Sequence, residues 1–201
     1  FDCTTSIIDT LLIKTTPKIN LINYSTTTLC TETPIDFINN GDSSGVSFLW
    51  DFGNFANVLS DTLKNPVNIF YIHGGTKTVT LNATDSLTGC AAAATQILNV
   101  SEKPSANFSS NASPCAGSKI DFSSSNTKTS SNGAWTYNWN FDADALPLTA
   151  ATKDIAGVVY ASGGKKGITL SVSDGECSNS KTDTLVLFDQ PIAFAGNDTS
   201  I

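Results

Sequence analysis

Two stretches decide the fold of this chain: VSFLWDFGN at residues 46–54 and TYNWNFDAD at residues 136–144. In both, apolar side chains recur at every second position through a central Trp, and turn residues follow. Alternation with a period of two predicts a half-buried β-strand. The pattern returns in TVTLNATD at 78–85 and GITLSVSD at 167–174, and no long segment has helical periodicity. The chain is therefore predicted to be all-β.

The two stretches belong to a sequence repeat with a period of 87 residues. Two sets of residues recur at this interval: Cys3, Cys90 and Cys177, and Pro17, Pro104 and Pro191. Between these anchors the interval shifts to 85 or 89 residues, as loops of different length would cause. We expect 1–16 to end a preceding copy, 18–103 and 105–190 to be whole copies, and 191–201 to be a linker and the start of a following copy. The chain would then be part of a longer array.

Each predicted copy has the layout of an immunoglobulin-like sandwich. About seven short strands around a central Trp, separated by turn clusters such as Asn39–Asp42 and Gly74–Gly75, fit into one period. Two antiparallel sheets packed face to face would bury that Trp. We therefore predict tandem antiparallel β-sandwiches.

Composition argues against several classes of function. The net charge is −7 at pH 7 and all eleven cations are Lys, which makes nucleic acid a poor partner. The single imidazole, His73, leaves no two-His zinc site and is expected at the surface. No apolar run approaches the roughly 20 residues of a membrane span, so we expect no membrane insertion. Asp142 and Asp144 lack the cleft that glycoside hydrolysis needs, and we expect no catalysis.

Five cysteines, an odd number, indicate disulfides and a partner outside the chain. The simplest pairing by position is Cys30 with Cys90 and Cys115 with Cys177, which leaves Cys3 unpaired in this segment. Oxidised pairs imply a periplasmic or extracellular location. Each pair would withhold about 210 Å of chain from extension under tension, at about 3.5 Å per residue. Free buried thiols are the alternative interpretation.

Both copies carry a motif that resembles the polycystic-kidney-disease (PKD) domain. The first copy has residues 46–54 followed by Asn65-Pro66, Phe70-Tyr71 and 75–81, and the second has residues 139–143, Tyr160, Gly164 and 168–170. The resemblance is closer in the first copy. It implies a sandwich whose inter-sheet core contains Trp50, Phe52, Tyr71, Trp139, Phe141 and Tyr160.

The resemblance also raises the question of calcium, because some PKD domains bind it near their start and in the turn after the Trp. Asp42, Asp51 and Asn54 are the candidate oxygen ligands. The last Asp of the family's turn is Asn54 here, and Asp in loops is usually a turn residue. We therefore expect no cofactor, with calcium as the candidate to test.

Two further groups of residues are candidates for contact with sugars. Four Asp-Ser/Thr-apolar triplets fit the O-glycosylation pattern of the flavobacterial phylum, with acceptors Thr10, Thr62, Ser86 and Thr184. Acceptors must be exposed, and the same residues also fit ordinary strands and turns. The aromatic pair Trp135 and Tyr137 lies near an insertion in the second copy, where it would either stack on a sugar or cover a loop.

Arrays of such domains that lack Arg and are rich in Thr, Ser and Asn resemble flavobacterial surface proteins of the type IX secretion system. The resemblance implies an extracellular, cell-surface repeat segment that gives reach and transmits force in adhesion or gliding motility. Its partners would be neighbouring repeats, surface polysaccharide or other cell-surface proteins. The alternative is an accessory carbohydrate- or protein-binding module of a secreted hydrolase.

Overall fold

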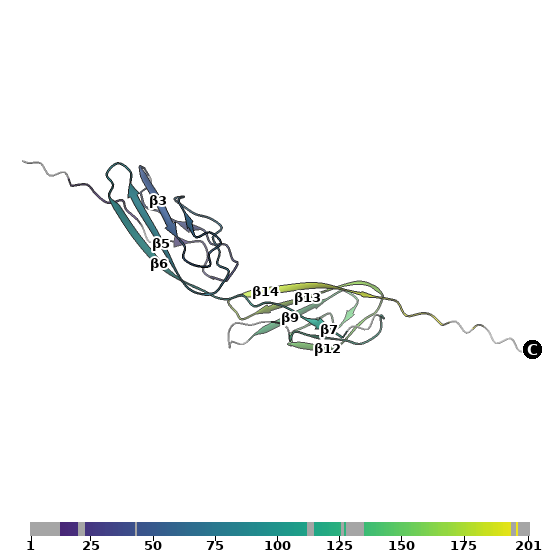
Figure 1. Ribbon diagram of the computed structural model, residues 1–201. Helices are drawn as coiled ribbons and strands as arrows, with labels where there is room; N and C mark the ends of the chain where they lie inside the picture. Colours follow the sequence, from purple (N-terminus) through teal and green to yellow (C-terminus); the bar gives the residue numbers. More distant parts are fainter. Residues whose placement is uncertain are drawn as a thin grey trace, which may run out of the picture. The chain divides into compact units, whose positions relative to one another are not determined.

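The computed structural model describes residues 13–19, 23–42, 44–111, 115–125, 127, 135–193 and 196. The chain divides into two compact units, Phe1–Val100 and Ser101–Ile201 (Figure 1). The described residues form strands, turns and loops without any helix, so the predicted all-β fold is confirmed. The expectations for Cys3, Thr10 and most of both chain ends lie outside the described residues. The repeat limits at Pro17, Pro104 and Pro191 stay predictions.

Unit 1 is an antiparallel sandwich. One sheet has the strand order β4-β3-β5-β6, with β3 at Val46–Asp51, β4 at Ser60–Asp61, β5 at Gly75–Asp85 and β6 at Ala91–Val100. The other layer contains β1 (Asn23–Tyr24) paired with β2 (Phe37–Ile38), and isolated bridges join Ile35 to Ile69 and Ala56 to Tyr71. A single cluster of buried side chains from both layers forms the core between them.

Unit 2 repeats this architecture. Its first sheet has the order β11-β9-β13-β14, with β9 at Thr136–Phe141, β11 at Thr149–Ala150, β13 at Gly164–Ser173 and β14 at Ser178–Leu187. The second sheet has the order β10-β12-β8-β7, with β7 at Ser109–Ser110, β8 at Ile120–Ser123, β10 at Ala145–Leu146 and β12 at Asp154–Tyr160. Trp139 pairs with Leu170 as Trp50 pairs with Leu81, which gives the two units the same register.

The period-two pattern fixes which side chains enter the cores. In β5 the burial alternates from Lys77 through Ala83, and the opposite side of the strand faces out. The expected core residues Trp50, Phe52, Tyr71, Trp139, Phe141 and Tyr160 are all at most 2% exposed. Each Trp also satisfies its indole N–H: Trp50 Nε1 donates to Leu63 O at 2.8 Å, and Trp139 Nε1 donates to Thr152 O at 2.9 Å.

The predicted cysteine pairs are wrong. Cys90 and Cys115 are free thiols, whereas Cys30 and Cys177 are disulfide-bonded. Neither Cys30–Cys90 nor Cys115–Cys177 can therefore be the bridge, and the tension mechanism that assumed a bridge inside each copy falls with them.

The geometry of unit 1 shows why its predicted pair cannot form. Glu32 N donates to Tyr71 O at 2.8 Å, so Cys30 lies near the end of the sandwich where β5 begins. Cys90 O accepts from Asp85 N at 2.9 Å, at the other end of β5. Ten strand steps of about 3.3 Å separate these ends by roughly 33 Å, whereas disulfide-bonded cysteines have Cα atoms within about 7 Å.

Unit 2 has the same arrangement. Cys115 forms a parallel bridge with Phe188, which follows the last residue of β14. Cys177 directly precedes Ser178, the first residue of β14. The eleven steps from Cys177 to Phe188 span about 36 Å by the same rise per residue, so the two cysteines lie at opposite ends of β14.

Candidate functional site

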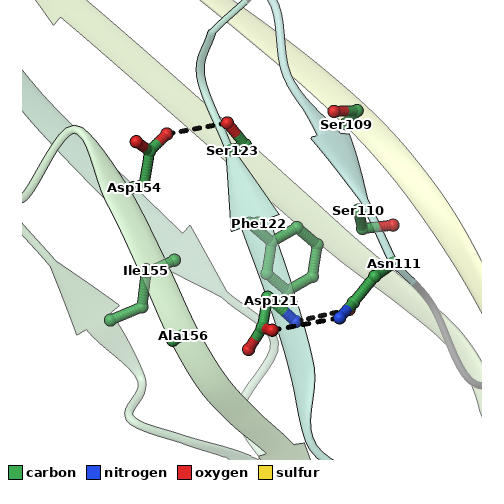
Figure 2. A pocket seen from close by; sticks show the side chains of 9 residues that line it. All are labelled: Ser109, Ser110, Asn111, Asp121, Phe122, Ser123, Asp154, Ile155 and Ala156. Atoms are coloured by element: carbon green, nitrogen blue, oxygen red, sulfur yellow. Dashed lines mark hydrogen bonds between the residues drawn. The ribbon is translucent and has the colours of Figure 1, made fainter.

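A groove of about 530 Å³ runs along the second sheet of unit 2, at β7, β8 and the first half of β12 (Figure 2). A register shift in the pairing of β12 with β8, between Ile155 and Val158, lies at this place. The groove is lined by Ser109, Ser110, Asn111, Asp121, Phe122, Ser123, Asp154, Ile155 and Ala156. Most of these residues have hydroxyl, amide or carboxylate side chains, although apolar atoms form the larger part of the groove surface, and the aromatic ring of Phe122 is 2% exposed.

Both carboxylates of the groove are occupied by bonds within unit 2 (Figure 2). Asp121 accepts from Gly157 N at 2.7 Å and from Asn111 Nδ2 at 3.0 Å. Asp154 Oδ1 accepts from Ser123 Oγ at 2.9 Å and from the backbone N–H of Ser124 at 2.9 Å. These bonds join β8 to β12 and to Asn111, the residue after β7, and exposed Ser109 and Ser110 add hydroxyl groups to the groove.

Unit 1 repeats the bond made by Asp121. There Asp36 Oδ1 accepts from Asn68 N at 2.9 Å, and Asn68 and Gly157 both have positive φ, 58° and 75°. In each unit a carboxylate therefore holds a left-handed backbone residue in place, which is a structural role. The groove carboxylate belongs to the repeated framework of the sandwich.

The calcium candidates do not converge. Asp42 lies before the start of β3, where its Oδ2 accepts from Lys18 N at 2.8 Å. Asp51 is the last residue of β3 and its Oδ1 accepts from Gly53 N at 2.8 Å, with Asn54 nearby in the same turn. In the described part of the chain, no group of three or more His, Cys, Asp or Glu is placed to hold a metal ion. Asp42 lies beside Val46, the first residue of β3, and Asp51 ends this strand about 16 Å further along, so these two carboxylates do not face one site.

Each unit buries one lysine above its core tyrosine. Lys77 and Lys166 are 7% and 6% exposed, and their Nζ atoms lie 5.5 Å and 5.8 Å from the ring centres of Tyr71 and Tyr160. A buried ammonium needs compensation. For Lys77 it comes from a second aromatic ring, that of Phe55, at 5.1 Å.

In unit 2 an acid replaces that second ring. Lys166 Nζ donates to Asp144 Oδ2 at 2.6 Å and to Ser162 Oγ at 3.2 Å. These hydrogen bonds, first from Lys166 and then from Ser162, lower the pKa of Asp144 from 3.8 to about 2. Asp144 is therefore an anion at all ordinary pH values, which excludes it as a general acid.

Burial affects the tyrosines in the opposite direction. It raises the pKa of Tyr71 to about 12, with a further contribution from Asp51. It also raises the pKa of Tyr160 to about 12, with contributions from Asp142 and Asp144. Tyr71 donates its hydroxyl to Phe52 O at 2.9 Å, whereas Tyr160 Oη has no partner among the described residues. Both phenols are packed as neutral core groups.

The ion pair predicts an acid-dependent stability for unit 2. Because the folded pKa of Asp144 lies below its unfolded value of 3.8, its contribution is complete above about pH 4 and disappears as pH falls towards 2. In Asp144→Asn, this part of the pH dependence should be absent. The measurement is the denaturant midpoint between pH 2 and pH 5. Asp183→Asn is the control, because Asp183 is exposed and, among the residues that the structure describes, accepts a hydrogen bond from its neighbour Thr184 N alone. Equal pH slopes in both variants would contradict the prediction.

The other predicted positions lie as follows. The candidate acceptors Thr62, Ser86 and Thr184 are exposed, as glycosylation requires. His73 is exposed, with its ring edge-on to Phe55 at 4.9 Å.

Trp135 and Tyr137 are half-buried and pack against the core of unit 2. This position favours the interpretation that the two side chains cover part of the domain. It argues against an exposed surface on which a sugar could stack.

Sequence reasoning missed the buried lysines, although a signal was present. Lys77 and Lys166 follow a Gly pair by two residues, and both stand in register with the apolar face of their strands. A lysine at an apolar-face position in two copies of a repeat indicates a buried cation with a repeated partner.

The strands and cores described above define a broad structural class, the all-β domains with an immunoglobulin-like sandwich architecture. Within that class, residues 101–187 match the family model described as the PKD domain. The match supports PKD-like domains in this chain. A search of curated proteins finds no match.

A search of solved structures finds matches from different sources. They include three N-terminal domains of the outer capsid protein Hoc of bacteriophage RB49 (9% identity, TM-score 0.37, covering 85% of this chain and 59% of that one). Fibronectin(III)-like modules of Clostridium thermocellum CbhA match with 13% identity and a TM-score of 0.34, covering 89% of this chain and 100% of that one. The ectodomain of mouse nectin-like molecule 4 matches with 14% identity and a TM-score of 0.34, covering 89% of this chain and 66% of that one. The chain thus spans less than two thirds of the Hoc and nectin-like structures.

Proposed function

We propose that this segment is an extracellular, non-catalytic spacer of PKD-like repeats, which gives reach and transmits force in surface adhesion or gliding motility. The observation that carries the proposal is the duplication of the buried framework. Both units repeat the indole-to-carbonyl bond, the lysine above the core tyrosine and the carboxylate that holds a left-handed residue. The exposed residues of the groove and the loops differ between units, as expected when the repeated property is mechanical.

The ends of unit 2 support a role under load. Cys115, which lies between β7 and β8, forms a parallel bridge with Phe188 just after the last strand, and Ala116 N donates to Phe188 O at 2.9 Å. Tension on the two ends of the unit pulls these parallel segments in opposite directions. The bridge is then loaded in shear, and it must give way before the strands behind it can separate.

The chemistry of the chain supports an extracellular or secreted location. Disulfide-bonded Cys30 and Cys177 require an oxidising compartment, and the PKD match agrees with one. Over its described residues, the chain has no helix with the length and apolar character needed to cross a membrane. Attachment to the cell surface, type IX export and a likeness to the giant gliding-motility adhesin of flavobacteria are parts of the proposal. So are its partners: neighbouring repeats, surface polysaccharide or other cell-surface proteins.

The groove of unit 2 favours one second candidate, an accessory binding module of a secreted hydrolase. The groove is open, and Ser109 and Ser110 expose hydroxyl groups to a polar ligand such as a carbohydrate. An unrelated domain of equal length can replace a spacer without loss of function, whereas it cannot replace a binding module, because the binding surface would be lost.

A replacement experiment separates the two candidates. In the protein that carries this segment, we expect deletion of residues 18–190 to reduce the fraction of cells retained on a surface under flow. We expect two unrelated sandwiches of equal length to restore it, because a spacer needs length and mechanical strength only. Retention that stays low after the replacement would overturn the spacer role and support the binding module. Retention unchanged by the deletion would contradict both roles.

A further inference from the structure

We propose that strand β6 of unit 1 is a docking edge for a second copy of this chain, whose own β6 pairs with it in antiparallel orientation. In the described part of the chain, β6 ends the strand order β4-β3-β5-β6 and has one hydrogen-bonded neighbour, β5 (Figure 1). It runs for ten residues, Ala91–Val100. A strand at the edge of a sheet presents a row of backbone groups that can pair with another chain. The length of β6 is sufficient to template a whole partner strand.

The register of β6 on β5 shows which backbone groups face the open edge. Asp85 N donates to Cys90 O at 2.9 Å where the hairpin begins. Hydrogen-bonded and non-hydrogen-bonded pairs alternate along an antiparallel ladder, so the even-numbered residues of β6 bond to β5. The N–H and C=O groups of the odd-numbered residues point the other way: Ala91, Ala93, Thr95, Ile97 and Asn99. Gln96 Nε2 donates to Ile97 O at 3.1 Å, which agrees with a carbonyl directed away from β5.

The sequence of β6 lacks the features that usually protect an edge strand. Native edges are blunted by charged residues, Pro or bulges. β6 reads AAAATQILNV, without a charged residue or a Pro, and its ten residues pair with β5 without a shift in register. The corresponding edge strand of unit 2, β14, carries Lys181 and Asp183. Of these two edge strands, β6 is therefore the one that is open to association.

Two copies of β6 satisfy each other's outward backbone groups in one register. With Thr95 opposite the partner's Thr95 on a two-fold axis, Ala93 lies opposite Ile97 and Ala91 lies opposite Asn99. Every outward-facing residue then belongs to a hydrogen-bonded pair, and two bonds in each pair give about ten hydrogen bonds. A shift of the register by two residues leaves an end residue of each copy unpaired. The full length of the edge therefore selects the register centred on Thr95.

The side chains of β6 fit together across the same axis. On the outer face Ile97, which is 61% exposed, lies opposite the small side chain of the partner's Ala93, and the two Thr95 side chains meet on the axis. On the core side, Leu98 lies opposite the partner's Ala92. Both large aliphatic side chains thus meet an Ala, and no like charges are brought together, because β6 contains no charge.

The pairing is expected to be weak for a single pair of copies. Each backbone hydrogen bond replaces bonds to water, so its net contribution is small. Weak contacts become effective where many copies are held close together. The pairing does not depend on the spacer role, so the isolated chain tests it separately.

Sedimentation velocity of the whole chain, over a series of concentrations, tests the association. We expect a reversible equilibrium in which the fraction of dimer rises with concentration. A chain that stays monomeric at every concentration at which it is soluble overturns the proposal.

A pair of matched variants tests the place of the contact. Thr95→Lys should abolish the dimer, because it sets two ammonium groups against each other on the two-fold axis. Thr182→Lys is the control, because Thr182 lies 87 residues later, is also exposed and belongs to the edge strand of unit 2. It should leave the dimer intact. A dimer that survives Thr95→Lys, or one that both substitutions remove, overturns the proposal.

Cysteine cross-linking tests the register without relying on a loss of association. In a chain with Cys90→Ser and Cys115→Ser, Thr95→Cys should give disulfide-linked dimers on oxidation. Paired residues in such a ladder have Cα atoms about 5.5 Å apart, which a disulfide can span. Thr78→Cys is the control, because exposed Thr78 lies on β5, three strand spacings or at least about 14 Å from its copy. Cross-linked dimers from both variants, or from neither, overturn the proposed pairing.

Discussion

Cys90 and Cys115 should react with N-ethylmaleimide in the oxidised chain, whereas Cys30 and Cys177 should react only after reduction. The first two are free thiols and the last two are disulfide-bonded. A bonded cysteine has no thiolate to attack the maleimide. Mass spectrometry of the tryptic peptides measures the label: we expect two maleimides on 78–119, which contains Cys90 and Cys115, and none on 19–64 or 167–181 until reductant is added.

The same experiment tests the pairing inside each copy. Bridges between Cys30 and Cys90 and between Cys115 and Cys177 would leave 78–119 without label until reduction. Cys90→Ser, the control, should lower the count on 78–119 to one maleimide and leave the other peptides unchanged. Label on 19–64 or 167–181 before reduction would contradict the prediction.

The sequence predicted the strands that carry the cores, because alternation is a local property. The stretches with a period-two pattern form strands β3, β5, β9 and β13. Trp50 and Trp139 lie in the cores, as the resemblance implied. The burial of these strands needs no knowledge of distant residues.

The cysteine pairing was not predictable in the same way. It depends on which end of the sandwich each turn occupies, and that requires a count of strand directions between the cysteines. β1, β2 and β4 have two residues each, so no periodic pattern marks them and their directions could not be counted. The pairing by position therefore joined opposite ends of each unit.

The framework around Lys77 and Lys166 was missed for a different reason. A lysine interrupts an apolar pattern, and its aliphatic stem can be buried while its ammonium finds a ring or an acid. The groove depends on the irregular pairing of β12 with β8 near Gly157, and the sequence of β12 contains no pattern that predicts this irregularity. Partners remote in sequence decide both features.

Trp139→Ala is expected to destabilise unit 2 by about 3–5 kcal/mol, the usual cost of removing a buried Trp. Its ring lies 5.3 Å from Phe108, 5.9 Å from Phe122 and 6.0 Å from Phe141, measured between ring centres. The substitution leaves these three rings facing a cavity and also leaves Thr152 O without its indole donor. Both effects act on a side chain that is 0% exposed, where little relaxation is available.

Hydrogen exchange resolved by peptide measures the loss in each unit separately. Protection of β13 and β14 should fall by about 10²–10³·⁵, because each 1.4 kcal/mol corresponds to tenfold, while protection of β5 and β6 stays unchanged. Trp50→Ala is the matched control and should give the reverse pattern, since Trp50 occupies the same place in unit 1 and is also 0% exposed. A spacer of independent domains needs this separation, so that a lesion in one repeat leaves its neighbour folded. Equal loss of protection in both units after either substitution would show that the two sandwiches fold as one, and a modular array would then be the wrong description of this chain.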